Sequence, residues 1–240
     1  GTVINCAGGP TPWGWLSCEE STAPQHGYVF LCDPHADRVQ MPNKIAAYGR
    51  FKHEAACIDT RSNTVYLTED QTDSSFYRFV PDDPREPFVG RLQALRIVGK
   101  DRHPAADMTR GQTLPIAWVD IDTPDPGTDT VSAQAQEKGA AVFARGEGIT
   151  IFKHEIFIVT TSGGPIGRGQ IFRLIDSPDD PTLEVVVVAD ETETINRPDN
   201  ITVAPWGEPF FSEDSGGTNY VRSIGPDGEI FDFGRNALSD

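Results

Sequence analysis

Acidic residues recur at one place in three separate segments of this sequence, and their side chains could bind a multivalent cation. Each opens an apolar, strand-like run: Glu54 in EAACID, Glu147 in EGITIF and Asp199 in DNITV. Carboxylate oxygens are preferred ligands of Ca²⁺ and other hard cations, and like charges crowded together are unfavourable unless a cation lies among them. The pattern therefore favours a cation site where these strands begin.

A second set consists of adjacent acid pairs that follow apolar strands. The pairs are Glu19 with Glu20, Glu69 with Asp70, and Glu213 with Asp214. Acids at strand ends are often only solvated loop residues, but three pairs at matching positions favour a shared role. Glu213 is added to the candidate metal ligands on this repeat alone.

Basic residues precede two of the strand-opening acids by two positions: Arg145 before Glu147 and Arg197 before Asp199. A guanidinium beside such a site either forms a structural ion pair or, with the metals, binds an anionic substrate. His53, next to Glu54, could orient a ligand or simply pack. The sequence has no HExxH or GxSxG motif, and SGGPIGRGQ lacks the Lys-Thr pair of a P-loop. It is therefore predicted to be a loop.

The elements that position these residues are predicted to be antiparallel strands. Residues 54–83, 147–180 and 199–228 share one plan of acid, strand, turn, strand, loop and strand, and residues 13–37 repeat its last part. Three or four strands repeated at roughly 45 to 50 residues are typical of β-propeller blades. The first strand of each blade lines the axis, so the acids would meet there. A β-sandwich is the alternative.

Two further elements complete the expected fold. GRLQALRIVG together with PIAWVDID predicts an additional blade, and a short helix is expected within 129–145, capped by Asp129 or Ser132. The prolines and glycines of NCAGGPTPWG, from residue 5, predict a rigid turn.

Composition narrows the classes of partner. The 240 residues contain 36 acidic and 20 basic side chains, a net charge of −16, which argues against nucleic acid. No apolar run approaches the roughly 18 to 20 residues of a membrane span. Cys32 and Cys57 lie in apolar runs and are predicted to be buried, while Cys6 and Cys18 could form a disulfide. No signal peptide is visible and the first residue is Gly1, as in a mature product or a fragment.

Five stretches in the same order resemble the PhoX-type alkaline phosphatases: NCAGGPTPWGWLSCEES, GRFKHEAACID, VYLTEDQTDSSFYRF, FARGEGI and RPDNI. Together they extend from residue 4 to about residue 214. The resemblance implies a six-bladed β-propeller with iron(III) and calcium at one end of its channel. It also implies hydrolysis of phosphate monoesters and export through the twin-arginine route, and hence a periplasmic or secreted protein.

The resemblance also implies roles for individual residues. The implied metal ligands are Cys6, Glu20, Glu54, Glu69, Asp70, Glu147 and Asp199. Cys6 would bind iron instead of forming a disulfide, which leaves Cys18 as a structural thiol. Glu147 would bind calcium, and Arg145 would bind the phosphate. The family's phosphate-binding lysine, which precedes the NCA motif, and its closing blade have no counterpart in this sequence.

We therefore expect one β-propeller domain over residues 1–240, incomplete at both ends, with about four to five blades and no oligomeric partner. Two other functions are weighed against a metal-dependent phosphomonoesterase. One is a calcium-dependent propeller hydrolase of the lactonase type, which needs neither a thiolate nor a substrate-binding arginine. The other is a non-catalytic binding module that uses metals only for stability.

Overall fold

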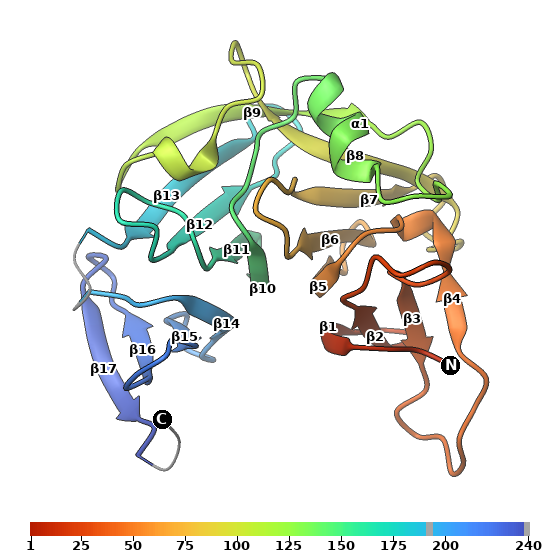
Figure 1. The fold of residues 1–240 in the computed structure, drawn as a ribbon, viewed down its shortest axis with the longest axis horizontal. Helices are drawn as coiled ribbons and strands as arrows, with labels where there is room; N and C mark the ends of the chain where they lie inside the picture. Colours follow the sequence, from red (N-terminus) through yellow and green to blue (C-terminus); the bar gives the residue numbers. More distant parts are fainter. Residues whose placement is uncertain (191–193, 238–240) are drawn as a thin grey trace.

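The computed structural model describes residues 1–190 and 194–237, and this part of the chain forms an all-β propeller. Four blades of antiparallel strands stand side by side in an arc around a central axis (Figure 1). The first and fourth blades lie at the two ends of the arc, near the N and C termini. The expectation of a propeller with four to five blades is thus confirmed, with four present in the described residues.

Each blade consists of four consecutive strands, and the first strand of each lies nearest the axis. The first blade has β1 (Asn5–Thr11), β2 (Gly14–Glu19), β3 (Val29–Cys32) and β4 (Asn43–Ile45). The second has β5 (His53–Asp59), β6 (Thr64–Glu69), β7 (Tyr77–Pro81) and β8 (Gly90–Ile97). The third has β10 (Gly146–Phe152), β11 (Glu155–Thr160), β12 (Gln170–Ile175) and β13 (Thr182–Val188). The fourth has β14 (Pro198–Val203), β15 (Pro209–Glu213), β16 (Tyr220–Ile224) and β17 (Ile230–Arg235).

Strand β9 (Thr113–Asp120) joins the second and third blades, and it corrects the prediction of an additional blade. GRLQALRI is β8, the outer strand of the second blade, and PIAWVD belongs to β9. Ile116 of β9 pairs with Ile97 of β8, whereas Leu114 pairs with Leu183 of β13. Because the two ends of β9 pair with different blades, the segment extends existing sheets and founds none of its own.

The predicted short helix is α1 (Val131–Glu137), but its predicted caps are wrong. Thr130 occupies the N-cap position, and no side chain caps the helix. Val131 and Ala135 are fully buried against the apolar layer between the first two blades, so packing stabilises this short helix. Two 3₁₀ turns, η1 (Ala46–Tyr48) and η2 (Ala105–Asp107), complete the elements.

The hydrophobic core lies between neighbouring blades, in three clusters. Tyr48 and Tyr77 belong to the cluster of the first two blades, Phe172 to the next and Phe211 to the last. The glycine-rich NCAGGPT stretch forms the inner strand β1, and the predicted turn is confined to Pro12 and Trp13, between β1 and β2. A Cβ atom on Gly9 would lie 2.0 Å from the carbonyl oxygen of Ala56, so glycine lets β1 approach β5 closely.

All four cysteines are free thiols, so Cys6 and Cys18 form no disulfide. Cys18 and Cys57 are buried, but the prediction for Cys32 is wrong. Cys32 is the last residue of β3, where the strand leaves the sheet, and its side chain is exposed. Among the described residues, no helix is long and apolar enough to cross a membrane.

Candidate metal centre

Each of the four inner strands is interrupted by a β-bulge near its beginning. The pairing register shifts between Asn5 and Gly8, His53 and Ala56, Gly146 and Ile149, and Pro198 and Ile201. The residues that begin these interruptions are Cys6, Glu54, Glu147 and Asp199. A bulge leaves a residue unpaired and redirects its side chain, and such features are frequent next to active sites. The same distortion in four blades therefore directs one thiol and three carboxyl groups to one end of the axis.

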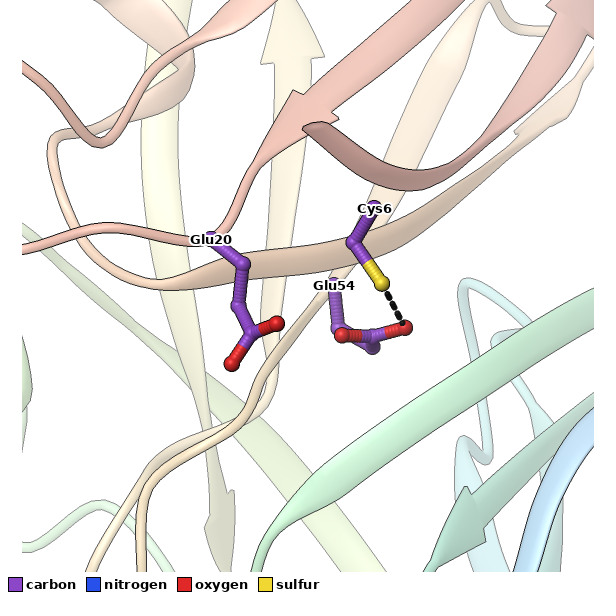
Figure 2. A group of neighbouring side chains, drawn as sticks. All are labelled: Cys6, Glu20 and Glu54. Atoms are coloured by element: carbon purple, nitrogen blue, oxygen red, sulfur yellow. Dashed lines mark hydrogen bonds between the residues drawn. The ribbon is translucent and has the colours of Figure 1, made fainter. Parts of the chain in front are cut away.

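The side chains of these strands form two overlapping groups of potential metal ligands. One ligand atom each from Cys6, Glu20 and Glu54 lies within 4.8 Å of the others, and the same holds for Glu54, Glu147 and Asp199. Figure 2 shows Cys6, Glu20 and Glu54 projecting into the same space, with Cys6 Sγ 2.8 Å from Glu54 Oε1. Glu54 belongs to both groups, so its carboxylate could bridge two cations.

These groups line a cavity of about 330 Å³ at one end of the axis. Its walls hold six carboxyl groups, one thiol and two guanidinium groups. The lining residues are Cys6, Glu20, Glu54, Asp70, Arg145, Glu147, Thr161, Arg197, Asp199, Asn200 and Asp214. The structure thus brings together six of the eight predicted metal ligands and the predicted phosphate-binding arginine.

Only the second acid of each adjacent pair lines the cavity. These residues are Glu20, Asp70 and Asp214. Their backbone N–H groups donate to the carbonyl oxygens of Ile4, Lys52 and Arg197, at 2.9, 3.1 and 2.9 Å respectively. The repeated hydrogen bond places the three residues at one equivalent position in three blades.

The first acid of each pair is buried and points away from the cavity, because successive side chains of a strand lie on opposite faces. The Glu69 carboxylate accepts hydrogen bonds from the Tyr77 hydroxyl at 2.7 Å and the Ser75 N–H at 3.2 Å. Glu19 likewise accepts from the Val3 N–H at 2.8 Å and the Gly27 N–H at 2.7 Å. These carboxylates hold together the loops that follow their strands.

Glu213, the first acid of its pair in the fourth blade, is likewise buried and points away from the cavity. Its carboxylate accepts from Arg222 Nε at 2.9 Å, the Asn196 N–H at 2.8 Å and the Tyr220 N–H at 3.1 Å. The structure therefore does not bring the predicted ligands Glu69 and Glu213 to the cavity.

Asp214 and Thr161 line the cavity but were not among the predicted site residues. In the third blade Thr161 N–H donates to the Arg145 carbonyl oxygen at 3.0 Å, so Thr161 stands where the other blades have the second acid. Alignment of the repeats identifies both positions, but it does not indicate which member of each pair faces the axis.

The two arginines of the cavity differ in their contacts. Arg145 donates to both carboxylate oxygens of Asp70, at 2.7 and 2.9 Å, and its Nη2 lies 3.2 Å from Glu147 Oε1. The hydrogen bonds to Asp70 raise the pKa of Arg145 above its usual value. Arg197 is exposed, and its side chain forms no hydrogen bond or ion pair within residues 1–190 and 194–237.

The crowded acidic groups favour their protonated forms. Burial, and then the neighbouring carboxylates, raise the pKa of Glu54 to about 7 and that of Glu147 to about 9. Burial and Asp214 also raise the pKa of Asp199, while burial and the hydrogen bond to Glu54 raise that of the Cys6 thiol to about 12. A bound cation would reverse these shifts, because it favours the charged form of every group around it.

His53 does not contact the acids of the cavity. Its ring is buried and stacked on Phe51, with ring centroids 3.6 Å apart, and Nε2 donates to the Gly49 carbonyl oxygen at 3.0 Å. Burial lowers the pKa of His53 to about 4. Of the two roles weighed for it, the structure supports packing.

Fold and cavity together define a β-propeller with a candidate metal centre at one end of its axis. The sequence profile of the alkaline phosphatase PhoX family matches residues 1–239, and the chain belongs to this family. No curated protein matches the chain.

A solved structure shows the same fold. The chain is similar to Pseudomonas fluorescens PhoX in complex with vanadate, a transition state analogue, with 22% identity and a TM-score of 0.75. That match covers 97% of this chain and 60% of the solved one, so this chain spans about 60% of the length of that relative. A putative 6-phosphogluconolactonase from Bacteroides uniformis matches with 12% identity and a TM-score of 0.45, over 98% of this chain and 55% of the other.

Proposed function

We propose that the cavity binds iron(III) and calcium and that the chain carries the active site of an alkaline phosphatase acting on phosphate monoesters. The observation that carries the proposal is the convergence of Cys6, Glu54, Glu147 and Asp199 from equivalent bulges in four blades. Membership of the PhoX family supports a hydrolase of the phosphatase type.

The residues of the cavity fit these metals. Cys6, Glu20 and Glu54 offer sulfur and oxygen ligands, a donor set that suits a transition metal such as iron. Glu54, Glu147 and Asp199 offer oxygen only, the donor set of calcium. Burial, and then the neighbouring carboxylates, raise the pKa of Glu54 and Glu147, and a bound cation would stabilise their charged forms.

Arg145 would bind the phosphoryl group of the substrate. Asp70 holds the Nε and Nη2 atoms of Arg145, which fixes the plane of the guanidinium and leaves its Nη1 hydrogens to donate to a phosphoryl oxygen. When bound, the metal ions supply positive charge that stabilises the phosphoryl oxygens in the transition state. This assignment needs no serine nucleophile, in keeping with the lack of a GxSxG motif.

The cellular setting is proposed on the same basis. Family membership supports a periplasmic or extracellular protein, and we propose that it acts as a monomer in which residues 1–240 belong to one propeller domain.

The structure of P. fluorescens PhoX contains vanadate, a transition state analogue, and this supports phosphoryl chemistry at the site.

Metal analysis and a phosphatase assay on the same sample test the proposal. After incubation with iron and calcium, we expect the protein to retain both metals and to hydrolyse a phosphate monoester. Glu147→Ala should lose calcium and activity, whereas Asp227→Ala, which removes an exposed carboxylate outside the cavity, should retain both.

Two outcomes would contradict the proposal. Undiminished hydrolysis by Glu147→Ala would show that the site is wrongly assigned. Retention of calcium alone, without phosphatase activity, would favour the lactonase-type hydrolase or the non-catalytic binding module.

A further inference from the structure

One position near the mouth of the cavity is equivalent in all four blades and is occupied mostly by cations. It lies two residues before each bulged residue, and its carbonyl oxygen accepts from the N–H of Glu20, Asp70, Thr161 or Asp214. The residues at this position are Ile4, Lys52, Arg145 and Arg197. Arg145 and Arg197 line the acidic cavity, and Lys52 contacts Glu20 of its wall.

Two of the three cations are neutralised by the protein itself. Lys52 Nζ lies 3.0 Å from Glu20 Oε1, and Arg145 holds Asp70 through two hydrogen bonds. Arg197 differs, since no acceptor among the described residues contacts its guanidinium, although Asp199 and Asp214 line the same cavity. Within the part of the chain that the structure describes, none of its five N–H donors has an acceptor, so they can serve a ligand.

The backbone of Arg197 is held firmly in spite of its exposed side chain. Its N–H donates to the Arg168 carbonyl oxygen at 2.8 Å, and its carbonyl oxygen accepts from the Asp214 N–H at 2.9 Å. Its φ of 54° lies in the left-handed region, which a residue other than glycine seldom occupies without such support. The point from which the guanidinium extends is therefore fixed relative to the cavity.

Depth distinguishes Arg197 from Arg145. The Arg145 side chain is 36% exposed and contacts Glu147, which is 6% exposed, whereas Arg197 is an exposed residue of the cavity wall. A phosphoryl group bound at Arg145 would direct the rest of the substrate towards solvent, and Arg197 is the other guanidinium that lines this cavity.

We propose that Arg197 binds a second anionic group, carried by the leaving-group side of the substrate. The substrates favoured by this residue are phosphate monoesters whose alcohol bears a carboxylate or another phosphate. The inference rests on the proposed phosphatase function, because that function assigns the phosphoryl group to Arg145. Arg197 is a specificity-determining residue in this account, and the reaction itself proceeds without it.

Kinetics with a matched pair of substrates test the inference. Phenyl phosphate and 4-carboxyphenyl phosphate differ by one carboxylate. We expect Arg197→Gln to raise KM for 4-carboxyphenyl phosphate by about tenfold, as the loss of a charge-assisted hydrogen bond predicts. KM for phenyl phosphate should stay within about twofold, because that substrate has no group for Arg197 to bind.

The control variant is Arg168→Gln. Arg168 lies in the loop between β11 and β12. Its side chain donates to the Asn196 side chain at 3.0 Å and does not line the cavity. It removes the same charge, so it should leave the ratio of the two KM values unchanged. A similar change of this ratio in Arg168→Gln would show that the effect comes from the loss of positive charge in general and not from a contact with Arg197. That result would overturn the proposal.

Equilibrium binding separates this inference from the proposed function. Calorimetry with phenylphosphonate and 4-carboxyphenylphosphonate, which contain no hydrolysable ester, should show about tenfold tighter binding of the carboxylated ligand to the metal-loaded wild type. Arg197→Gln should lose that preference.

The two claims then fail in different ways. If no sample hydrolyses a monoester but the binding preference exists and depends on Arg197, the phosphatase assignment is wrong and the assignment of Arg197 stands. If the wild type shows no preference, if Arg197→Gln keeps it, or if both ligands weaken equally, the assignment of Arg197 is overturned.

Discussion

Glu213 and Asp214 are adjacent in the sequence and carry the same charge, yet they belong to different parts of the molecule. Glu213 is buried and accepts hydrogen bonds from Arg222, Asn196 and Tyr220. Asp214 is exposed and lines the acidic cavity. The first carboxylate stabilises the fold because its donors are supplied by the protein, and the second adds to the excess negative charge of the cavity, which a bound cation would offset.

The same alternation occurs on an inner strand, between His53 and Glu54. His53 packs against Phe51 in the core, and Glu54 turns into the cavity through the bulge. Neighbouring polar residues of this propeller thus divide into an anchoring group that contacts the core and a cavity group that faces the axis. Variants of the two groups should therefore differ in the direction of their effect on stability.

The largest expected effect is the loss of an anchoring residue. Glu213→Ala should lower the free energy of unfolding by about 4 kcal/mol, because it leaves two backbone N–H groups without their acceptor and the buried Arg222 with Asp232 as its remaining ion-pair partner. Asp214→Ala should change it by less than about 0.5 kcal/mol, as expected of an exposed side chain. Urea unfolding of both variants measures the difference. Equal losses would abolish the distinction between anchoring and cavity carboxylates.

A somewhat smaller effect concerns acid stability and His53. Its folded pKa of about 4 lies below the ordinary 6.5, so the unfolded chain binds the proton more readily and stability is lost as the pH falls through this window. Between pH 7 and pH 4 the wild type should lose roughly 3 kcal/mol more than His53→Gln, measured by urea unfolding at both values. The exposed His35→Gln should follow the wild type. Parallel losses in the wild type and His53→Gln would contradict the assignment of His53 to the anchoring group.

The smallest expected effect has the opposite sign. The folded pKa of Glu54, about 7, lies above the ordinary 4.5, so its contribution to stability falls as the pH rises through this window. At pH 8 in the presence of a chelator, this pKa difference corresponds to roughly 3 kcal/mol. Glu54→Gln also loses the charge-assisted hydrogen bond with Cys6, so it should raise the free energy of unfolding by about 1 to 2 kcal/mol. The same variant should lose the stabilisation that added calcium confers on the wild type. A destabilised Glu54→Gln in chelator would place Glu54 with the anchoring residues.

Much of the architecture could be predicted from the sequence because it depends on local patterns. The repeated order of acid, strand, turn and strand identified the blades, and the strand-opening acids Glu54, Glu147 and Asp199 all line the cavity. The role of β9 could not be predicted in this way. Its strand pattern is clear, but its pairing with both β8 and β13 depends on residues far away in the chain.

The acid pairs show how far the candidate site could be predicted from the sequence. The sequence identified each pair, but the predicted ligands included both Glu69 and Asp70 and took Glu213 in place of Asp214, the residue that lines the cavity. That choice depends on strand alternation, and a shift of one residue in register would exchange the two faces. The register in turn follows from pairing with the inner strand and from its bulge.

The sequence by itself therefore determined the repeating β-strand plan, the acidic and thiol groups available at each blade, and the family to which they correspond. Only the tertiary structure decided which carboxylates meet at the axis, that Asp70 holds Arg145, and that Arg197 contacts no acid within residues 1–190 and 194–237. The physical reason is that composition and periodicity are local, whereas the direction of a side chain depends on pairing between strands distant in the sequence.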